Sequence, residues 1–297
     1  MGPRLRVPVA GIPGAWSTDR LQHALAEAGA ETFAFQLADC ILDLAEGTVT
    51  VGDLDLGTVD GLAVKKLGQF GDPGAPSRVQ LLQQLEFRGV RVFSPADSIR
   101  EVNDRYQMTQ RLAQAGLPVP RTIITEGVEV AGDVVERWGR AVVKPLYTSK
   151  GRGMLLLASE EPYRLKLKQW LREWNPPFYV QEYLPNPGRD IGVAVLAGEV
   201  CGAFFRVAHP GSWLTTTAAA GHYERCEVTP EMRRLACDAA DLFGLDFTVV
   251  DLVESRGGYL IYEVSAFGGF AGLWQTQGID AAKLYAEHIV RTLRTKR

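Results

Sequence analysis

The stretch VVKPLYTSKGRGM, residues 142–154, decides the fold class. An apolar β run ends in Lys144, and a loop rich in hydroxyl groups and glycine leads back to a second β run that begins at Met154. Glycines let backbone N–H groups approach phosphate oxygens, and a lysine adds a positive charge. The spacing of a P-loop is absent and no helix follows. The stretch therefore predicts a β-hairpin that either binds phosphate or is purely structural.

Two apolar strands near the C-terminus each contain one carboxylate. They are VVDL, residues 249–252, and IYEVS, residues 261–265. A buried carboxylate is costly unless it is paired or bound to a cation, and Mg²⁺ prefers carboxylates together with phosphate oxygens and water. If the two strands form a hairpin, Asp251 and Glu263 face each other and predict a magnesium site. Two structural ion pairs are the alternative.

Two further stretches are less specific. FYVQEYLP, residues 178–185, has the pattern of a strand followed by a hinge whose backbone could pair with an adenine edge, although taken alone the pattern fits an ordinary strand end better. GSWLTTTAAAG, residues 211–221, is a loop of small and hydroxyl-bearing residues. It is typical of a loop that binds phosphate or substrate oxygens, and also of a plain surface loop.

The composition narrows the class of protein. Of the 297 residues 46% are hydrophobic, enough for a large core, and the formal net charge of −3 argues against a dedicated nucleic-acid binder. The four cysteines contain no C-x-x-C pair, so neither a disulfide framework nor a zinc site is expected. No signal peptide and no apolar run of about 18 residues is visible. We expect a cytoplasmic protein without membrane or nucleic-acid partners.

Strands alternate with helices over residues 1–95. Strands are predicted over 6–10, 31–35, 62–64 and 90–93, and helices over 77–88 and from a cap at Ser17 or Thr18 to Gly29. This alternation implies a small parallel α/β unit, with a ligand site at the carboxyl ends of its strands.

Short β runs dominate after one long helix, which is predicted over 97–115. They cover 122–125, 141–145, 154–158, 178–183, 192–196, 200–208, 247–253 and 259–264. Helices are predicted over 130–138, 161–173 and 280–293, and from the cap Thr229 and Pro230 to Gly244.

Taken in order, these stretches resemble the ATP-grasp superfamily, in particular its RimK-like branch of amino-acid and glutamate ligases. The resemblance extends from about Val90 to Ile289. Its motifs are Asn103-Asp104-Arg105, Val143-Lys144-Pro145, Gln181-Glu182-Tyr183, Gly188-Arg189-Asp190-Ile191, Asp251, Glu263 and Thr276-Gln277-Gly278-Ile279-Asp280. Within the branch, the stretches KPLY (144–147), GSW (211–213) and EVSAFGGF (263–270) are similar to the ATP-grasp protein of the GAK gene system.

The resemblance implies an α/β (α+β) architecture, an ATP-grasp fold preceded by a pre-ATP-grasp α/β domain. The implied domains are 1–95 and 96–297, the second divided into a small lid subdomain (about 122–184) and a C-terminal catalytic subdomain (about 185–297). The implied activity is ligation: ATP and Mg²⁺, for which Mn²⁺ can substitute, activate a carboxylate as an acyl-phosphate, and an amine then displaces phosphate. Substrates would be amino acids or peptides, and relatives often form homo-oligomers.

The resemblance also assigns roles to residues. Lys144 and Arg206 would be catalytic, meeting the ATP phosphates and the transferring phosphate. The nucleotide contacts would be Arg105, Lys144, Ser149, Gly151, Gly153, Gln181, Glu182, Tyr183, Leu184 and Asp190. The metal ligands would be Asp251, Glu263 and Ser265, and the substrate loop would use Thr215, Thr216, Thr217 and Gly221.

Two departures from the family pattern keep other functions open. Relatives carry Glu-x-Asn at the metal, where this chain has Glu263-Val264-Ser265. Relatives also carry arginine and asparagine in the substrate loop, where Leu214, Thr216 and Ala219 stand here. A kinase that phosphorylates a small-molecule hydroxyl, or a non-catalytic ATP-binding regulatory protein, are therefore the alternatives.

Overall fold

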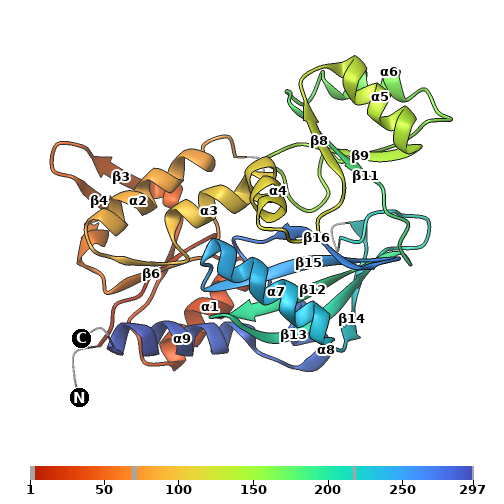
Figure 1. Ribbon diagram of the computed structural model, residues 1–297. Helices are drawn as coiled ribbons and strands as arrows, with labels where there is room; N and C mark the ends of the chain where they lie inside the picture. The colour runs from red at the N-terminus through yellow and green to blue at the C-terminus, as the bar shows by residue number, and fades with distance from the viewer. Residues whose placement is uncertain (1–3, 69–71, 217–218, 296–297) are drawn as a thin grey trace.

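The computed structural model describes residues 4–68, 72–216 and 219–295. Three units follow one another along the chain (Figure 1). We call them the N-terminal unit (residues 4–93), the lid unit (residues 122–182) and the central unit (residues 189–264), each built on its own sheet. Among the described residues, the N-terminal and lid sheets have four strands each and the central sheet has five.

The N-terminal unit is a parallel sheet covered by helices. Its strands are β1 (Val9–Ala10), β2 (Ala34–Phe35), β6 (Gly61–Val64) and β7 (Arg91–Phe93), and every pairing in this sheet is parallel. Its helices are α1 (Trp16–Glu27) and α2 (Val79–Phe87). Strand β6 is buried at all four positions, as expected for a parallel strand covered on both faces. The predicted alternation of strands and helices is confirmed.

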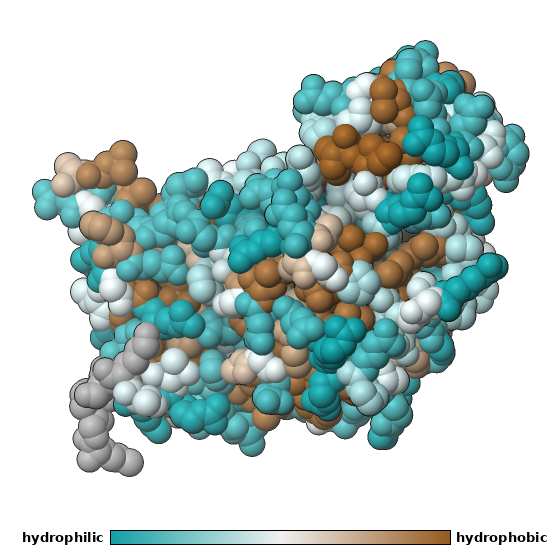
Figure 2. Space-filling view, in the orientation of Figure 1, coloured by the Kyte–Doolittle hydropathy of each residue, from teal (hydrophilic) through white to brown (hydrophobic). Residues whose placement is uncertain are grey.

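A small antiparallel sheet within this unit was missed by the sequence prediction. It consists of β3 (Cys40–Asp43), β4 (Thr48–Val51) and β5 (Leu54–Asp55). These strands are short and half-exposed, so they lack the apolar run that marks a buried strand. Ile41 and Leu44 are exposed there, and brown surface gathers over the β3–β4 hairpin in Figure 2.

The lid unit is an antiparallel sheet with two helices on one side (Figure 1). Its strands are β8 (Thr122–Thr125), β9 (Arg140–Lys144), β10 (Leu155–Ala158) and β11 (Phe178–Glu182). The helices are α5 (Val128–Trp138) and α6 (Tyr163–Trp170). The apolar side of α5 packs with Val143, Leu157 and Phe178 into a separate hydrophobic cluster. Because the lid unit has its own hydrophobic core, it forms a compact unit distinct from the rest of the molecule.

The central unit is a five-stranded antiparallel sheet. Its strands are β12 (Arg189–Leu196), β13 (Glu199–Val207), β14 (His222–Cys226), β15 (Phe247–Ser255) and β16 (Gly258–Val264). Helix α7 (Pro230–Phe243) packs on one face, against β12 and β15, and α8 (Ala271–Gln277) packs against β13 and β14. Strand β14 and helix α8 were not predicted, because β14 is mostly exposed and α8 has only seven residues.

The last helix, α9 (Ala281–Thr295), returns to the N-terminal unit and packs on α1 (Figure 1). One hydrophobic cluster joins residues of α1, β1, α9 and the central sheet, including Leu21, Val9, Ile289 and Val249. The N-terminal and central units therefore share a core, which holds their facing edges in place. None of the helices among the described residues is long and apolar enough to cross a membrane.

Two predicted helix boundaries are wrong. The single helix expected over 97–115 is two helices, α3 (Ala96–Asn103) and α4 (Arg105–Gln114). The break falls at Asp104, whose carboxylate accepts hydrogen bonds from the backbone N–H groups of Tyr106 and Gln107 and caps α4. Helix α1 begins at Trp16, and Thr18 lies inside it, where its hydroxyl accepts from Ile12 N–H instead of capping the helix.

Candidate active site

Lys144 is the last residue of β9 and its side chain is buried. Its Nζ donates a 2.6 Å hydrogen bond to Gln181 Oε1 on the neighbouring strand. Burial and, to a smaller extent, the nearby Arg105 lower the pKa of Lys144 to about 7, against the opposing effect of Glu263, Asp190 and Asp251. The lysine at the end of a lid strand therefore lies within the field of three carboxylates from the central sheet.

Gln181 is held by a chain of polar groups. Its Nε2 donates to Thr122 Oγ1 at 3.1 Å and to the Tyr179 hydroxyl at 3.0 Å, and that hydroxyl lies 2.8 Å from Thr109 Oγ1. These contacts leave the Oε1 acceptor facing Lys144. In this structure the predicted nucleotide residue Gln181 orients the lysine.

Asp251 and Glu263 lie opposite each other on β15 and β16, in a register that shifts immediately after Asp251. A bulge of this kind re-aims the side chains next to it. The facing carboxylates predicted from the two apolar strands are thus brought together. On the opposite side of β15, Asp251 pairs with Gly192 of β12, where the absence of a side chain makes room for the Phe204 ring.

Arg206 connects Asp251 to Asp190. Its Nε lies 2.6 Å from Asp190 Oδ1 and its Nη2 lies 2.7 Å from Asp251 Oδ2. Burial opposes the charge of Arg206, but the two carboxylates outweigh it and raise its pKa. Thr215 of the substrate loop donates its hydroxyl proton to Asp190 Oδ2. Arg206, Asp190 and Thr215, predicted to contact phosphate, nucleotide and substrate respectively, therefore form one connected group.

The carboxylates fit a magnesium ion. Asp251 Oδ1 is buried and, among the described residues, has no hydrogen-bond partner. Burial raises the pKa of Asp251 and Arg206 opposes that shift, so a cation at Oδ1 would satisfy a polar atom that the protein leaves unpaired. No cluster of three or more His, Cys, Asp or Glu that could hold a metal occurs in the described part of the chain. Two carboxylates suit Mg²⁺, which takes its other ligands from phosphate and water.

Ser265 lies next to this pair. Its backbone N–H donates to Val249 O at 3.0 Å, and its carbonyl oxygen accepts from Thr248 Oγ1 at 2.8 Å. Both contacts fix the backbone of the strand end, and neither uses the Ser265 hydroxyl.

Arg105, the first residue of α4, forms hydrogen bonds with the lid loop. Its guanidinium is buried and donates to the carbonyl oxygens of Pro145 and Thr148, the second at 2.7 Å. Its Nη2 also lies 3.6 Å from Glu263 Oε2. Arg105, predicted to meet phosphate, thus joins the start of the glycine loop to Glu263, a predicted metal ligand.

The glycine loop itself faces the substrate loop. Lys150, Gly151 and Gly153 all have positive φ angles, and Thr216 Oγ1 approaches Lys150 O at 3.5 Å. A side chain at Gly151 would stand 3.1 Å from Leu214. Ser149 is exposed at the crest of the loop. The loop that resembles a phosphate lid is therefore open to solvent on one side.

The predicted adenine hinge follows β11. The Glu182 N–H donates a 2.9 Å hydrogen bond to Arg121 O. The guanidinium carbon of Arg140 stands 4.3 Å from the centroid of the Tyr183 ring. Leu184 accepts from Asn186, whereas its N–H makes no hydrogen bond within the described ranges. One backbone donor at the hinge thus has no partner among the described residues.

Gly221 closes the substrate loop at a point where only glycine fits. A Cβ there would stand 2.7 Å from Thr215 O and 2.8 Å from Val207 O. Thr217, the remaining predicted substrate residue, lies outside the described residues.

The sequence prediction missed Lys65 and Lys66, which follow directly after β6. Lys65 is buried, donates to Gly268 O and stands 3.8 Å from the Phe270 ring centroid. Lys66 is half-buried, 5.7 Å from the Phe267 ring centroid. The signal was present, because two lysines after a buried parallel strand lie where such sheets bind ligands.

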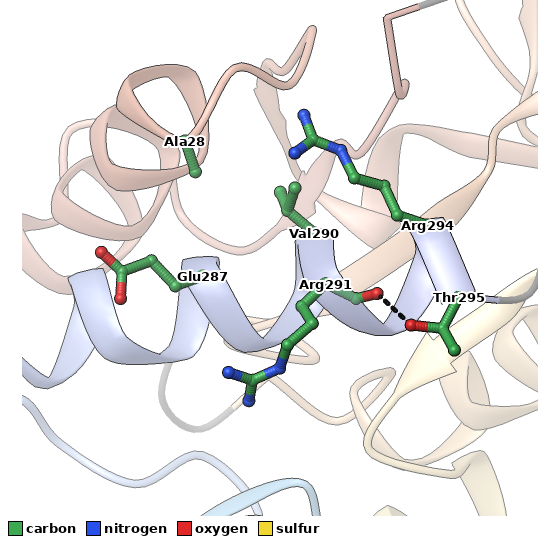
Figure 3. A pocket seen from close by; sticks show the side chains of 6 residues that line it. All are labelled: Ala28, Glu287, Val290, Arg291, Arg294 and Thr295. Carbon is green, nitrogen blue, oxygen red and sulfur yellow. Dashed lines mark hydrogen bonds between the residues drawn. The ribbon is translucent and has the colours of Figure 1, made fainter. Parts of the chain in front are cut away.

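A cavity of about 410 Å³ lies elsewhere, between α1 and α9. Figure 3 shows its lining, in which Val290 points toward Ala28 and the charged ends of Glu287 and Arg291 point away. None of its lining residues belongs to the group around Lys144, so it is separate from the candidate active site.

Comparison with known proteins identifies the family of this chain. The RimK-like ATP-grasp domain matches residues 102–289. A tetrahydromethanopterin:alpha-L-glutamate ligase of Methanosarcina acetivorans is 28% identical over 95% of this chain and 97% of its own length. A probable alpha-L-glutamate ligase of Citrobacter koseri is 30% identical over 71% of each chain.

Solved structures share the fold. The RimK domain ATP-grasp protein from Sphaerobacter thermophilus superposes with a TM-score of 0.76 at 22% identity, covering 95% of this chain and 98% of that one. The ATP-grasp ligase PsnB, complexed with a phosphomimetic variant of a minimal precursor, Mg and ADP, gives 0.75 at 20% identity, covering 97% and 98%. This chain therefore belongs to the RimK-like ATP-grasp family and is an ATP-dependent carboxylate–amine ligase.

Proposed function

We propose that Mg·ATP binds between the lid unit and the central sheet, with its phosphates between Lys144 and the carboxylates of Asp251 and Glu263. The observation that carries this proposal is the position of Arg105, which donates to the carbonyl oxygens of Pro145 and Thr148 in the lid loop and lies 3.6 Å from Glu263 Oε2 of the central sheet. Lys144 Nζ also stands 5.0 Å from the centroid of the Tyr262 ring, beside Glu263. A triphosphate with its metal is the ligand that matches a cation facing a carboxylate pair.

The roles of the other residues follow from their positions. The Leu184 N–H and the Glu182 carbonyl bind adenine, and Ser149, Gly151 and Gly153 close over the phosphates. Asp251 and Glu263 would hold Mg²⁺, which would supply positive charge at the phosphate oxygens. Arg206, which pairs with Asp190 and Asp251, would meet the transferring phosphate. Arg105 positions the loop and Glu263 together.

The reaction then has two balanced steps. A carboxylate oxygen of the substrate bonds to the γ-phosphorus while the bond to the ADP oxygen breaks, giving an acyl-phosphate. An amine attacks the acyl carbon, phosphate leaves with the bonding electrons, and the amine loses a proton. The protein contributes position and charge, so no nucleophilic side chain is required.

The substrates belong to the class that the relatives name. We propose an amino acid or peptide as one partner, since relatives carry names of glutamate ligases and PsnB is complexed with a peptide precursor. Thr215, Thr216 and Gly221 line the entrance for it. Use of Mn²⁺, homo-oligomer formation, a cytoplasmic location and membership in the GAK system stay predictions.

Product analysis tests the ligase outcome for this chain. Purified protein with ATP, Mg²⁺ and pools of amino acids, peptides and carboxylates is expected to release ADP and phosphate in equal amounts with a new amide, detected by mass spectrometry. A phosphorylated alcohol without free phosphate would replace the ligase with a kinase.

Glu263→Gln tests the metal site. The substitution keeps the shape of the side chain but removes the charge, so Mg-dependent turnover should fall by about 100-fold or more while the melting temperature changes little. Glu254→Gln on β15 is the matched control, because Glu254 pairs with Arg189 outside the site. Wild-type turnover in Glu263→Gln would remove Glu263 from the metal site.

A further inference from the structure

Lys66 stands at the edge where the N-terminal sheet meets the site. The backbone N–H groups of Lys65 and Lys66 both donate to Ala10 O, at 2.7 and 3.2 Å, which fixes this turn to the end of β1. The carboxyl ends of parallel strands are the usual ligand edge of such a sheet. The N-terminal unit thus presents a lysine at its ligand edge.

Lys66 lies against the segment of the chain that contains Phe267 and Gly268. The buried side chain of Lys65 donates to Gly268 O, in the segment that follows Glu263 and Ser265. That segment is packed tightly on β15, since a Cβ at Gly268 would stand 2.7 Å from Phe247 and 2.9 Å from the Val249 nitrogen. Lys66 lies against the neighbouring Phe267 ring. The hydrogen bond of Lys65 therefore fixes the backbone next to Lys66 against this segment.

Among the described residues, Lys66 has no anionic partner at ion-pair distance. Within the described ranges no carboxylate lies at ion-pair distance from its ammonium, and residues 69–71 and 217–218 contain no acidic side chain. Burial lowers its pKa, Lys150 of the glycine loop lowers it further, and Glu263 opposes both. A half-buried cation between another cation and a metal carboxylate is unfavourable until an anion binds there.

We propose that Lys66 is a further ligand of the γ-phosphate of ATP and contacts it from the N-terminal unit, while Lys144 contacts the phosphates from the lid. This inference rests on the proposed function. Asp251 and Glu263 would hold Mg²⁺, which would supply positive charge at the phosphates of ATP. Lys66 lies against the ring of Phe267, four residues after Glu263, and from there its ammonium would reach the terminal phosphate.

The step that Lys66 assists is the first transfer. As the carboxylate oxygen bonds to phosphorus and ADP departs, negative charge is spread over the three oxygens of the transferring group. The Lys66 ammonium stays protonated and stabilises that charge, then stays with the phosphate of the acyl-phosphate. Since it touches the reacting group, it is assigned as a catalytic residue.

Comparison of two nucleotides tests this assignment, because ADP lacks the γ-phosphate. Calorimetry would measure Mg·AMPPNP and Mg·ADP binding to wild type, Lys66→Met and the surface control Lys283→Met. We expect Lys66→Met to weaken Mg·AMPPNP by about tenfold, the loss of one charge-assisted contact, and to change Mg·ADP by less than about twofold. Lys66→Arg should restore part of the difference.

Equal weakening of both nucleotides, or no weakening of either, would overturn the assignment of Lys66. If wild type binds neither nucleotide, the proposed function fails as well, so the two failures are distinguishable.

A second measurement needs no variant. Acetic anhydride labels accessible lysines, and Mg·AMPPNP should protect Lys66 of the wild-type protein more than Mg·ADP does, with Lys283 labelled equally in both. Equal labelling of Lys66 with the two nucleotides would also overturn the assignment.

Discussion

Lys144 shows at the scale of one residue why a binding site destabilises a fold. Its ammonium is buried with one side-chain acceptor, Gln181 Oε1, at hydrogen-bond distance. One hydrogen bond to a charged group contributes about 1.5–3 kcal/mol, less than the penalty of removing an ammonium from water. The lowered pKa of Lys144 expresses that imbalance. Phosphate oxygens would supply the missing contacts and restore the proton.

Lys144→Met should therefore abolish measurable nucleotide binding and stabilise the ligand-free protein by about 1–4 kcal/mol near pH 7. The folded-state pKa, about 7, is below the unfolded value. Between these two pKa values the unfolded state binds more protons, so wild-type stability rises with pH. The advantage of Lys144→Met is thus largest at and below pH 7 and shrinks toward pH 10. Urea unfolding at pH 7 and 9 measures it, and an advantage that grows with pH would contradict this explanation.

Helix α7 shows at the scale of one element how local signals set boundaries. Thr229 Oγ1 accepts from Met232 N–H at 3.2 Å, Pro230 is the first helical residue, and Gly244 ends the helix in the left-handed conformation. All three were predicted, because caps and glycine act on their own neighbours. The single helix predicted over 97–115 was wrong, because Asp104 caps a new helix although the apolar periodicity continues past it.

Thr229→Ala should destabilise the protein by about 1 kcal/mol, because one N–H of the first turn of α7 loses its acceptor. Nucleotide affinity should be unchanged, since α7 packs on the face of the central sheet through Leu235 and Ala239 and contributes no residue to the site. Thr229→Ser keeps the hydroxyl and is the matched control. Equal stability of the alanine and serine variants in chemical denaturation would show that the cap contributes nothing.

At the scale of the whole molecule, three units meet at one place. The lid contributes Lys144 and the glycine loop, the central sheet contributes Asp190, Asp251 and Glu263, and the N-terminal unit contributes Lys66. Arg105 joins the lid loop to Glu263 through its bonds to Pro145 and Thr148. A nucleotide bound among these groups would hold the lid on the rest of the protein.

Mg·AMPPNP should accordingly slow tryptic cleavage after Lys150 and Arg152, two exposed positions of the glycine loop. Cleavage after Arg256, in the exposed turn between β15 and β16, should proceed at the same rate with and without nucleotide. Peptide mass mapping over time measures both sites. Equal protection at the two places would indicate general stabilisation of the fold instead of closure of the loop.

The sequence by itself determined the order of motifs, the buried strands and the pair of carboxylates on a hairpin. These features depend on neighbours along the chain: apolar runs predict strands, and facing positions follow from two strands joined by a short turn.

Only the tertiary structure decided which charges meet. Arg206 pairs with Asp190 and Asp251, and Arg105 contacts both the lid loop and Glu263. Lys66 of the N-terminal unit lies against the Phe267 ring, in the segment after Glu263. Such contacts join residues far apart in sequence, and the register shift after Asp251 and the packing of three units set them. Local sequence propensity does not predict the register shift or the packing of the three units, because each arises when separate segments are buried together.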